Sequence, residues 1–134
     1  MYGPRGILVC GYPASEQSSL LYLLDENGFS DLPAIFVSNP DLEKTLRELL
    51  ASPHRSGLGE DSEMRRAIIM SGFSQKELYK LMALYRLSEL PPQLWASLTP
   101  VSEKWSVAQL LDELAAESEA IKKQKRGMNK YVHK

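Results

Sequence analysis

Four short, largely apolar runs divide the chain and predict four strands. The runs occupy residues 7–10, 34–38, 67–70 and 93–98. The first and third are four residues long and rich in Ile, Val and Leu, which is typical of short strands buried on both faces. Leucines at helical spacing follow the runs, so the pattern predicts a helix after each strand and an α/β fold.

Both predicted helices of the first half begin or end at recognisable signals. The first helix is expected over about residues 15–27, with Gly28 as its C-terminal stop. The second is expected to start at Asn39 as cap, with Pro40 in the first helical position. Its buried stripe is made of leucines, at positions 42, 46, 49 and 50.

Capping boxes open both predicted helices of the second half. Ser74–Glu77 and Ser106–Gln109 have the spacing that pairs a hydroxyl and a longer polar side chain with free backbone N–H groups. Trp105 and Leu110 stand at the hydrophobic staple positions around the second box. The last helix is expected to reach about residue 126, longer than its equivalent, so it can dock on a partner subunit.

The second half of the chain repeats the pattern of the first. Two pairs of segments align, 7–13 with 68–74 and 32–44 with 91–104. The first alignment places Gly11 on Gly72, and the spacing between equivalent positions stays near 60 residues. Self-similarity of this kind predicts two diverged copies of one unit of roughly 50 residues.

These patterns predict a single domain of two βαβα halves forming one sheet of about four strands covered by helices. The first half is expected at residues 5–52 and the second at 66–121, with a mobile polar linker at 53–65 and a basic tail at 122–134. Strands joined by a crossover helix should be parallel within each half. We favour a pseudo-twofold arrangement in which the first strand of each half is central.

Length and composition are consistent with this fold. The chain has 134 residues, 43% of them hydrophobic and 25% charged, as in ordinary globular domains. Its apolar runs are too short to span a bilayer, and its N-terminal segment lacks the pattern of a signal peptide. The single cysteine, Cys10, allows no internal disulfide. We therefore expect a cytoplasmic protein without membrane contact.

Charge is distributed unevenly along the chain. The last thirteen residues carry six basic and no acidic side chains, whereas the preceding residues have a net charge of −7. An acidic body does not favour nucleic-acid binding, although Lys122, Lys123 and Arg126 in the tail can contact RNA or an acidic partner. The simpler interpretation, which we favour, is a solvated helix end whose cations complement the helix dipole.

The two turns at Gly11 and Gly72 are candidate sites for a small anion such as a phosphorylated metabolite. Each lies between a strand and a helix, where free N–H groups attract negative charge. Tyr12, Ser15 and Ser18 complete the candidate site of the first turn. Neither turn has the additional glycines or the lysine of known phosphate loops, so we favour purely structural turns.

No residues suggest catalysis, a metal site or a cofactor. Cys10 ends the first strand, where some enzymes keep a nucleophile, but the only histidines lie in the linker and the tail. One cysteine and two distant histidines have no zinc-ligand spacing. Trp105 and Tyr22 are candidate interface anchors, with core packing as the alternative for each.

The stretches AIIMSGFSQKELYKLMALYR and LWASLTPVSEKWSVAQLLDELAAE resemble a family of small bacterial proteins, domain-of-unknown-function family 3783. The resemblance covers about residues 65–120, and its carriers are Ser71–Phe73, the pair Thr99–Pro100, and Trp105. It implies a bacterial, intracellular protein and supplies no catalytic residues.

The sequence favours a non-enzymatic module that acts through protein contacts, as a homodimer or a regulatory subunit. A binder of small anions at the two glycine turns is the alternative, and RNA contact through the basic tail is a further one.

Overall fold

The computed structural model describes the backbone of residues 1–132 and the side chains of residues 1–124. The strands are β1 (Gly6–Cys10), β2 (Ala34–Val37), β3 (Ala67–Ser71) and β4 (Leu94–Ser97). The α-helices are α1 (Ala14–Glu26), α2 (Leu46–Leu50), α3 (Gln75–Leu87) and α4 (Val107–Val132). Two short 3-10 helices are η1 (Asn39–Glu43) and η2 (Ser102–Lys104). The predicted α/β fold with one four-stranded sheet is confirmed.

The strand order is β2-β1-β3-β4. Strands β1 and β2 are parallel, β3 and β4 are parallel, and the two halves meet where β1 pairs antiparallel with β3. The arrangement favoured from the sequence, with the first strand of each half central, is therefore confirmed. It leaves β2 and β4 as the two edges of the sheet.

A local twofold relation connects the halves at two places. Leu8 pairs with Ile69 in the central strands, and Thr45 forms an antiparallel bridge with Ser106 in front of α2 and α4. Both pairs are 61 positions apart in the chain, close to the spacing of about 60 between the similar segments of the sequence.

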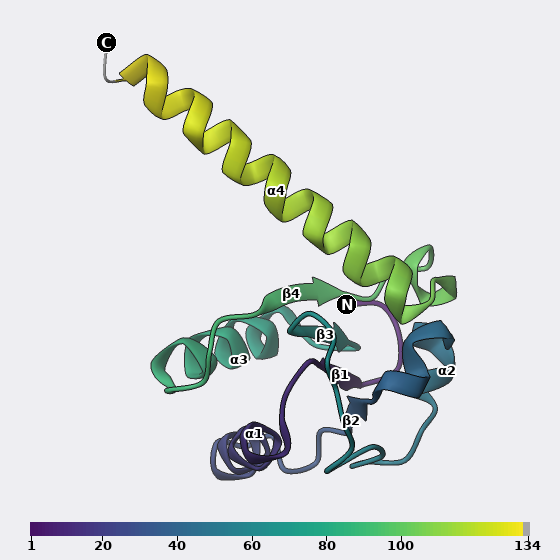
Figure 1. The fold of residues 1–134 in the computed structure, drawn as a ribbon. Helices are drawn as coiled ribbons and strands as arrows, with labels where there is room; N and C mark the ends of the chain where they lie inside the picture. The colour runs from purple at the N-terminus through teal and green to yellow at the C-terminus, as the bar shows by residue number, and fades with distance from the viewer. Residues whose placement is uncertain (133–134) are drawn as a thin grey trace.

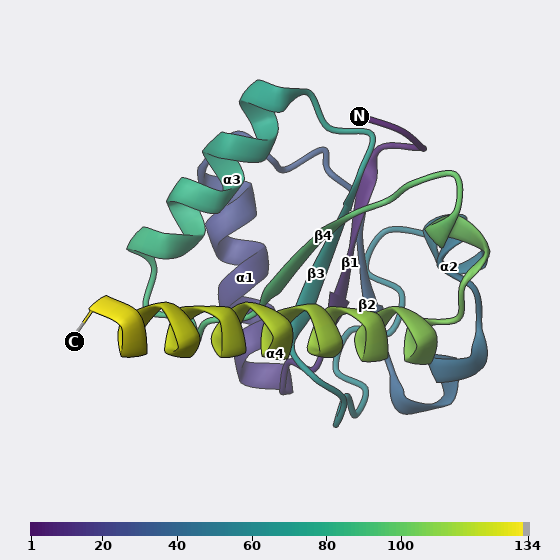
Figure 2. The same cartoon turned by 90° about the horizontal axis from the view of Figure 1, so that it is seen from above.

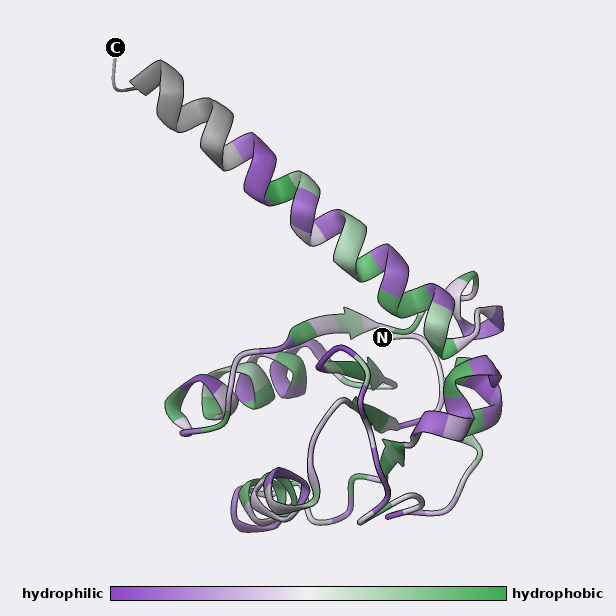
Figure 3. Cartoon of the chain, viewed as in Figure 1, coloured by the Kyte–Doolittle hydropathy of each residue, from purple (hydrophilic) through white to green (hydrophobic). Residues whose placement is uncertain are grey.

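Helices cover both faces of the sheet. In Figures 1 and 2, α1 and α3 lie on one face, and α2 with the start of α4 lies on the other. Strands β1, β2 and β3 are strongly hydrophobic, whereas β4 is paler along its length, as Figure 3 shows. One core cluster holds Tyr12, Phe29, Phe36 and Phe73, and the other is aliphatic. Burying both faces of central strands explains why their sequences are continuous apolar runs.

The helix predicted to start at Asn39 is in fact two short helices. The cap is Ser38, whose N–H and hydroxyl donate to the Asp41 carboxylate at 3.0 and 2.8 Å. Lys44 is extended, and Thr45 opens α2 with a capping box of its own. The break has a physical cause, because the bridge between Thr45 and Ser106 requires extended backbone at this position.

The segment predicted as a mobile linker is hydrogen-bonded along the outer edge of β2. The N–H of Arg55 donates to the Ala34 carbonyl, and the N–H of Phe36 donates to the Ser56 carbonyl, both at 2.8 Å. The N–H of Ala34 donates to Nδ1 of His54 at 3.0 Å. An edge strand has unpaired donors and acceptors, and here the chain itself pairs them.

Candidate functional site

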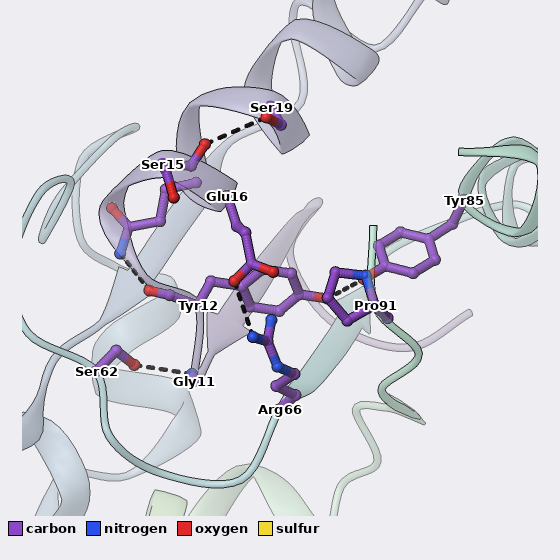
Figure 4. Close-up of polar contacts among 10 residues, drawn as sticks. Gly11, Tyr12, Ser15, Glu16, Ser19, Ser62, Arg66, Tyr85 and Pro91 are labelled. Carbon is purple, nitrogen blue, oxygen red and sulfur yellow. Dashed lines mark hydrogen bonds and ion pairs between the residues drawn. The ribbon is translucent and has the colours of Figure 1, made fainter. Parts of the chain in front are cut away.

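The amides of the two glycine turns are already occupied by the protein. The N–H of Gly11 donates to the Ser62 hydroxyl at 2.8 Å (Figure 4), and that hydroxyl donates to the Val37 carbonyl at 2.7 Å. The N–H of Gly72 donates to the Tyr2 carbonyl at 3.1 Å. Both N–H groups therefore already have an acceptor within the protein, which favours the structural interpretation of the turns at Gly11 and Gly72.

Each turn is also covered by an arginine from a neighbouring segment. The Arg66 guanidinium lies 5.2 Å from the Tyr12 ring centre, and its Nη2 is 2.9 Å from Glu16 Oε2, an ion pair that falls short of hydrogen-bond geometry (Figure 4). Arg5 makes the equivalent contacts with Phe73 and Glu77 at the second turn. These contacts seal the first turn with charges that compensate each other.

At the second turn, the Arg5 guanidinium lies 5.8 Å from the Phe73 ring centre and its Nη1 is 2.5 Å from Glu77 Oε2. The backbone N–H of Ser74 lowers the pKa of the Glu77 carboxyl, and the bond to Arg5 lowers it further. The predicted capping box at Ser74–Glu77 is confirmed. The same carboxylate therefore serves the helix start and the ion pair, and no anion is needed there.

The other members of the predicted ligand site do not converge on a cavity. Tyr12 is fully buried, and its hydroxyl shares a 2.6 Å hydrogen bond with that of Tyr85, which donates to the Pro91 carbonyl. Burial raises the pKa of the Tyr12 phenol. Ser15 and Ser18 are exposed on α1, and the Ser18 hydroxyl donates to a carbonyl of the first turn of α1.

Sequence reasoning missed the buried polar residue Gln17. Its Nε2 donates to the Tyr12 carbonyl at 2.9 Å, and its Oε1 accepts from the Gly59 N–H at 2.7 Å. It thereby ties the start of α1 to the segment that covers β2. The available signal was its position on the same helical face as Leu20, Leu21 and Leu24, where a polar side chain needs buried partners.

Cys10 is completely buried in the aliphatic core cluster. Burial raises the pKa of its thiol to about 12, so the thiolate is scarce at neutral pH. We expect no reaction with a thiol reagent in the native protein at pH 8, and one equivalent of reaction after denaturation. Absorbance after adding a disulfide dye measures both, and rapid native labelling would show that the site opens.

The predicted interface residues lie far apart on the surface. Tyr22 is 69% exposed on α1, whereas Trp105 is half-buried against the aliphatic cluster, as expected of a staple. Lys122 and Lys123 are exposed on α4, and the Arg126 side chain lies outside the described residues. These residues do not form one patch.

A different feature stands out at the opposite edge of the sheet from β2. The backbone groups of Leu94, Ala96 and Leu98 point toward β3. The N–H of Leu94 donates to the carbonyl of Arg66, just before β3, and the N–H of Leu98 donates to the Met70 carbonyl. By alternation, the N–H and C=O groups of Trp95 and Ser97 point outward. Within the described residues these groups have no backbone partner, so the β4 edge is open.

A groove runs between this open edge and the overhanging helix α4. It has a volume of about 460 Å³, and an adjoining hollow of about 330 Å³ lies between β4 and the middle of α4. The groove is lined by residues of the segment before β3, the start of β4 and α4: Arg65, Arg66, Pro92, Gln93, Leu94, Ala115, Ser118, Glu119 and Lys122. Figure 1 shows α4 leaving the domain above β4. Trp95, Leu114 and Ile121 give the hollow its apolar surface.

The part of the chain that contains the open edge matches a protein family. Residues 66–121 match the family model of DUF3783. The family is described as a domain of unknown function. No curated protein and no solved structure matches the chain. The DUF3783 segment contains β3, α3, β4 and the first part of α4, and therefore the open edge and most of the groove.

The described residues contain neither a membrane-spanning helix nor a group of metal ligands. None of their helices combines the length and the hydrophobicity that crossing a membrane requires. Within the same residues, no three His, Cys, Asp or Glu side chains are grouped so that they can hold a metal ion.

Proposed function

We propose that this domain is a non-enzymatic protein-interaction module that accepts an extended segment of another protein along β4. The observation that carries the proposal is the difference between the two edges of the sheet. Strand β2 is buried beneath the segment of residues 53–63, whereas β4 is half-exposed along its length. A row of unpaired N–H and C=O groups on an exposed edge is the recognition surface used in strand addition.

The outer edge of β2 provides the comparison, although the segment that pairs with it is folded into tight turns. Ala34 and Phe36 have the same outward orientation as Trp95 and Ser97, 61 positions later, and both are paired with chain segment 54–56. This correspondence supports the further proposal that the halves are two copies of one unit. The first half is closed by a segment of its own chain, and the second half takes an equivalent segment from a partner.

The proposal includes the setting expected from the sequence, a bacterial cytoplasmic protein. A single cysteine without a disulfide partner is consistent with a reducing compartment. The bacterial source is supported by the family resemblance alone.

A peptide with the sequence of residues 52–63 is a suitable probe, because this segment already pairs with the equivalent edge. With the ¹⁵N-labelled protein, we expect the peptide to shift the amide signals of Trp95 and Ser97. A Ser97→Pro variant should weaken binding about tenfold or more, because proline removes the outward donor without touching the β3 ladder. The matched control, Ser97→Ala, should bind like the wild type. Shifts outside β4, or equal binding by both variants, would contradict the proposal.

A further inference from the structure

We infer that the segment accepted by β4 is acidic where it enters the groove beneath α4; this inference rests on the proposed function. The groove lies at the start of β4, next to Pro92, Gln93 and Leu94. A segment that pairs with Trp95 and Ser97 must pass this groove. The chemistry of its walls therefore selects which side chains a partner can place there.

The walls are basic on an otherwise acidic body. Arg65, Arg66 and Lys122 line the groove, and Glu119 is its one acidic lining residue. Arg86 adds a cation to a neighbouring hollow of about 320 Å³, which shares Pro92 and Gln93 with the groove. Because residues 1–121 together have a net charge of −7, this concentration of positive charge is local. It attracts carboxylates and repels a basic segment.

The charges in the groove are compensated only in part. Arg66 pairs with Glu16, and Lys122 Nζ is 3.9 Å from Glu119 on the exposed surface of α4. Among the described residues Arg65 is exposed and has no acidic partner in an ion pair. Three cations therefore face two carboxylates, Glu16 and Glu119, and the groove keeps an excess of one positive charge for an incoming carboxylate.

Two buried donors in the same walls lack an acceptor. Nη1 of Arg66 and Nε2 of Gln93 have no hydrogen-bond partner within the described residues. Both are N–H donors that need an acceptor, and Glu16 Oε2, which lies 2.9 Å from Arg66 Nη2, also has no hydrogen-bond partner. Leaving buried donors unpaired is costly, and a carboxylate that enters the groove brings two oxygens that accept hydrogen bonds. The unpaired donors and the local charge point to the same ligand group.

The direction is inferred from β2, which is contacted by a covering segment that is folded into tight turns. Residues 55 and 56 contact Ala34 and Phe36 in increasing order. A segment bound to β4 in the same direction places the residues that precede the paired ones at the groove. The acidic side chains are therefore expected on the N-terminal side of the residues that pair with Trp95 and Ser97.

Three variants of the 52–63 peptide test the inference, with residues 52 and 53 replaced by two glutamates, two glutamines or two lysines. We expect the glutamate peptide to bind about five times more tightly than the glutamine peptide, as one or two exposed ion pairs allow, and the lysine peptide to bind most weakly. The differences in affinity among the three peptides should disappear in 0.5 M salt, and the ranking should reverse with the Arg65→Glu variant of the protein.

The outcomes separate the two proposals. If all three peptides shift Trp95 and Ser97 with equal affinity, the inference is overturned and strand addition stands. If no peptide shifts these residues, strand addition fails as well. A dimer in sedimentation equilibrium with protected Trp95 and Ser97 amides would show that a second copy occupies the edge, which also overturns the inference.

Discussion

Replacing Gly11 with alanine is expected to lower the free energy of unfolding by roughly 2–4 kcal/mol. Gly11 has a φ of +78°, where a side chain is strained, and an added Cβ would lie 2.4 Å from the Met64 carbonyl oxygen and 2.8 Å from the Arg65 backbone. Neither atom belongs to a flexible side chain, so the chain before β3 must move. Chemical denaturation measures the loss.

Gly72→Ala should have a similar effect, because its Cβ would lie 2.7 Å from the Arg5 nitrogen and the Gly3 carbonyl. Gly28→Ala is the matched control. Gly28 also has a positive φ, +86°, but its nearest neighbour is the mobile end of Lys80 at 3.1 Å, so we expect a loss of only about 1 kcal/mol. Equal losses at Gly11 and Gly28 would show that backbone strain, not close packing, sets the requirement for glycine.

Replacing Gly57 with alanine is expected to detach the segment that covers β2. A Cβ at this position would lie 2.0 Å from the Phe36 carbonyl oxygen, a contact that the edge strand cannot relieve by rotating a side chain. The segment must move away and break the hydrogen bonds from Phe36 to Ser56 and from Arg55 to Ala34. We expect a loss of about 2–4 kcal/mol in unfolding free energy.

Gly59→Ala is the control for this change. Gly59 lies in the same segment with a φ of +85°, but no heavy atom lies within 4 Å of the position of its Cβ. The Gly59→Ala substitution should lower the free energy of unfolding by about 1 kcal/mol and leave the Phe36 amide protected from hydrogen exchange. A Gly57→Ala protein with a protected Phe36 amide would contradict the assignment of this segment as the cover of β2. With the cover lost, this edge should also bind the 52–63 peptide.

Local signals in the sequence predicted much of the fold. Continuous apolar runs predicted the strands, because the central strands are buried on both faces. The Ser74–Glu77 box predicted the start of α3, since it acts within a few residues of the chain. The internal similarity predicted the central position of β1 and β3, because two equivalent strands meet most simply around a twofold axis.

The features of the candidate site depend on contacts between distant residues, and the sequence could not predict them. The polar composition of residues 53–65 suggested mobility, but the free edge of β2 supplies partners for that backbone. The glycine turns suggested free amides, although Ser62 and Tyr2 occupy them. Likewise, the run at residues 93–98 predicted a strand but not its place at an edge of the sheet, and no segment of the described chain pairs with the outer edge of β4.

We propose that one edge of the sheet is closed by the chain itself and that the other is open to a partner. Amide hydrogen exchange tests it most directly, by comparing Phe36 with its equivalent, Ser97. In the protein alone, we expect the Ser97 amide to exchange roughly a hundredfold faster than that of Phe36. A saturating concentration of the 52–63 peptide should slow hydrogen exchange of the Ser97 amide and leave exchange of the Phe36 amide unchanged. Equal protection of the two amides without peptide, or no protection of Ser97 with it, would contradict the account.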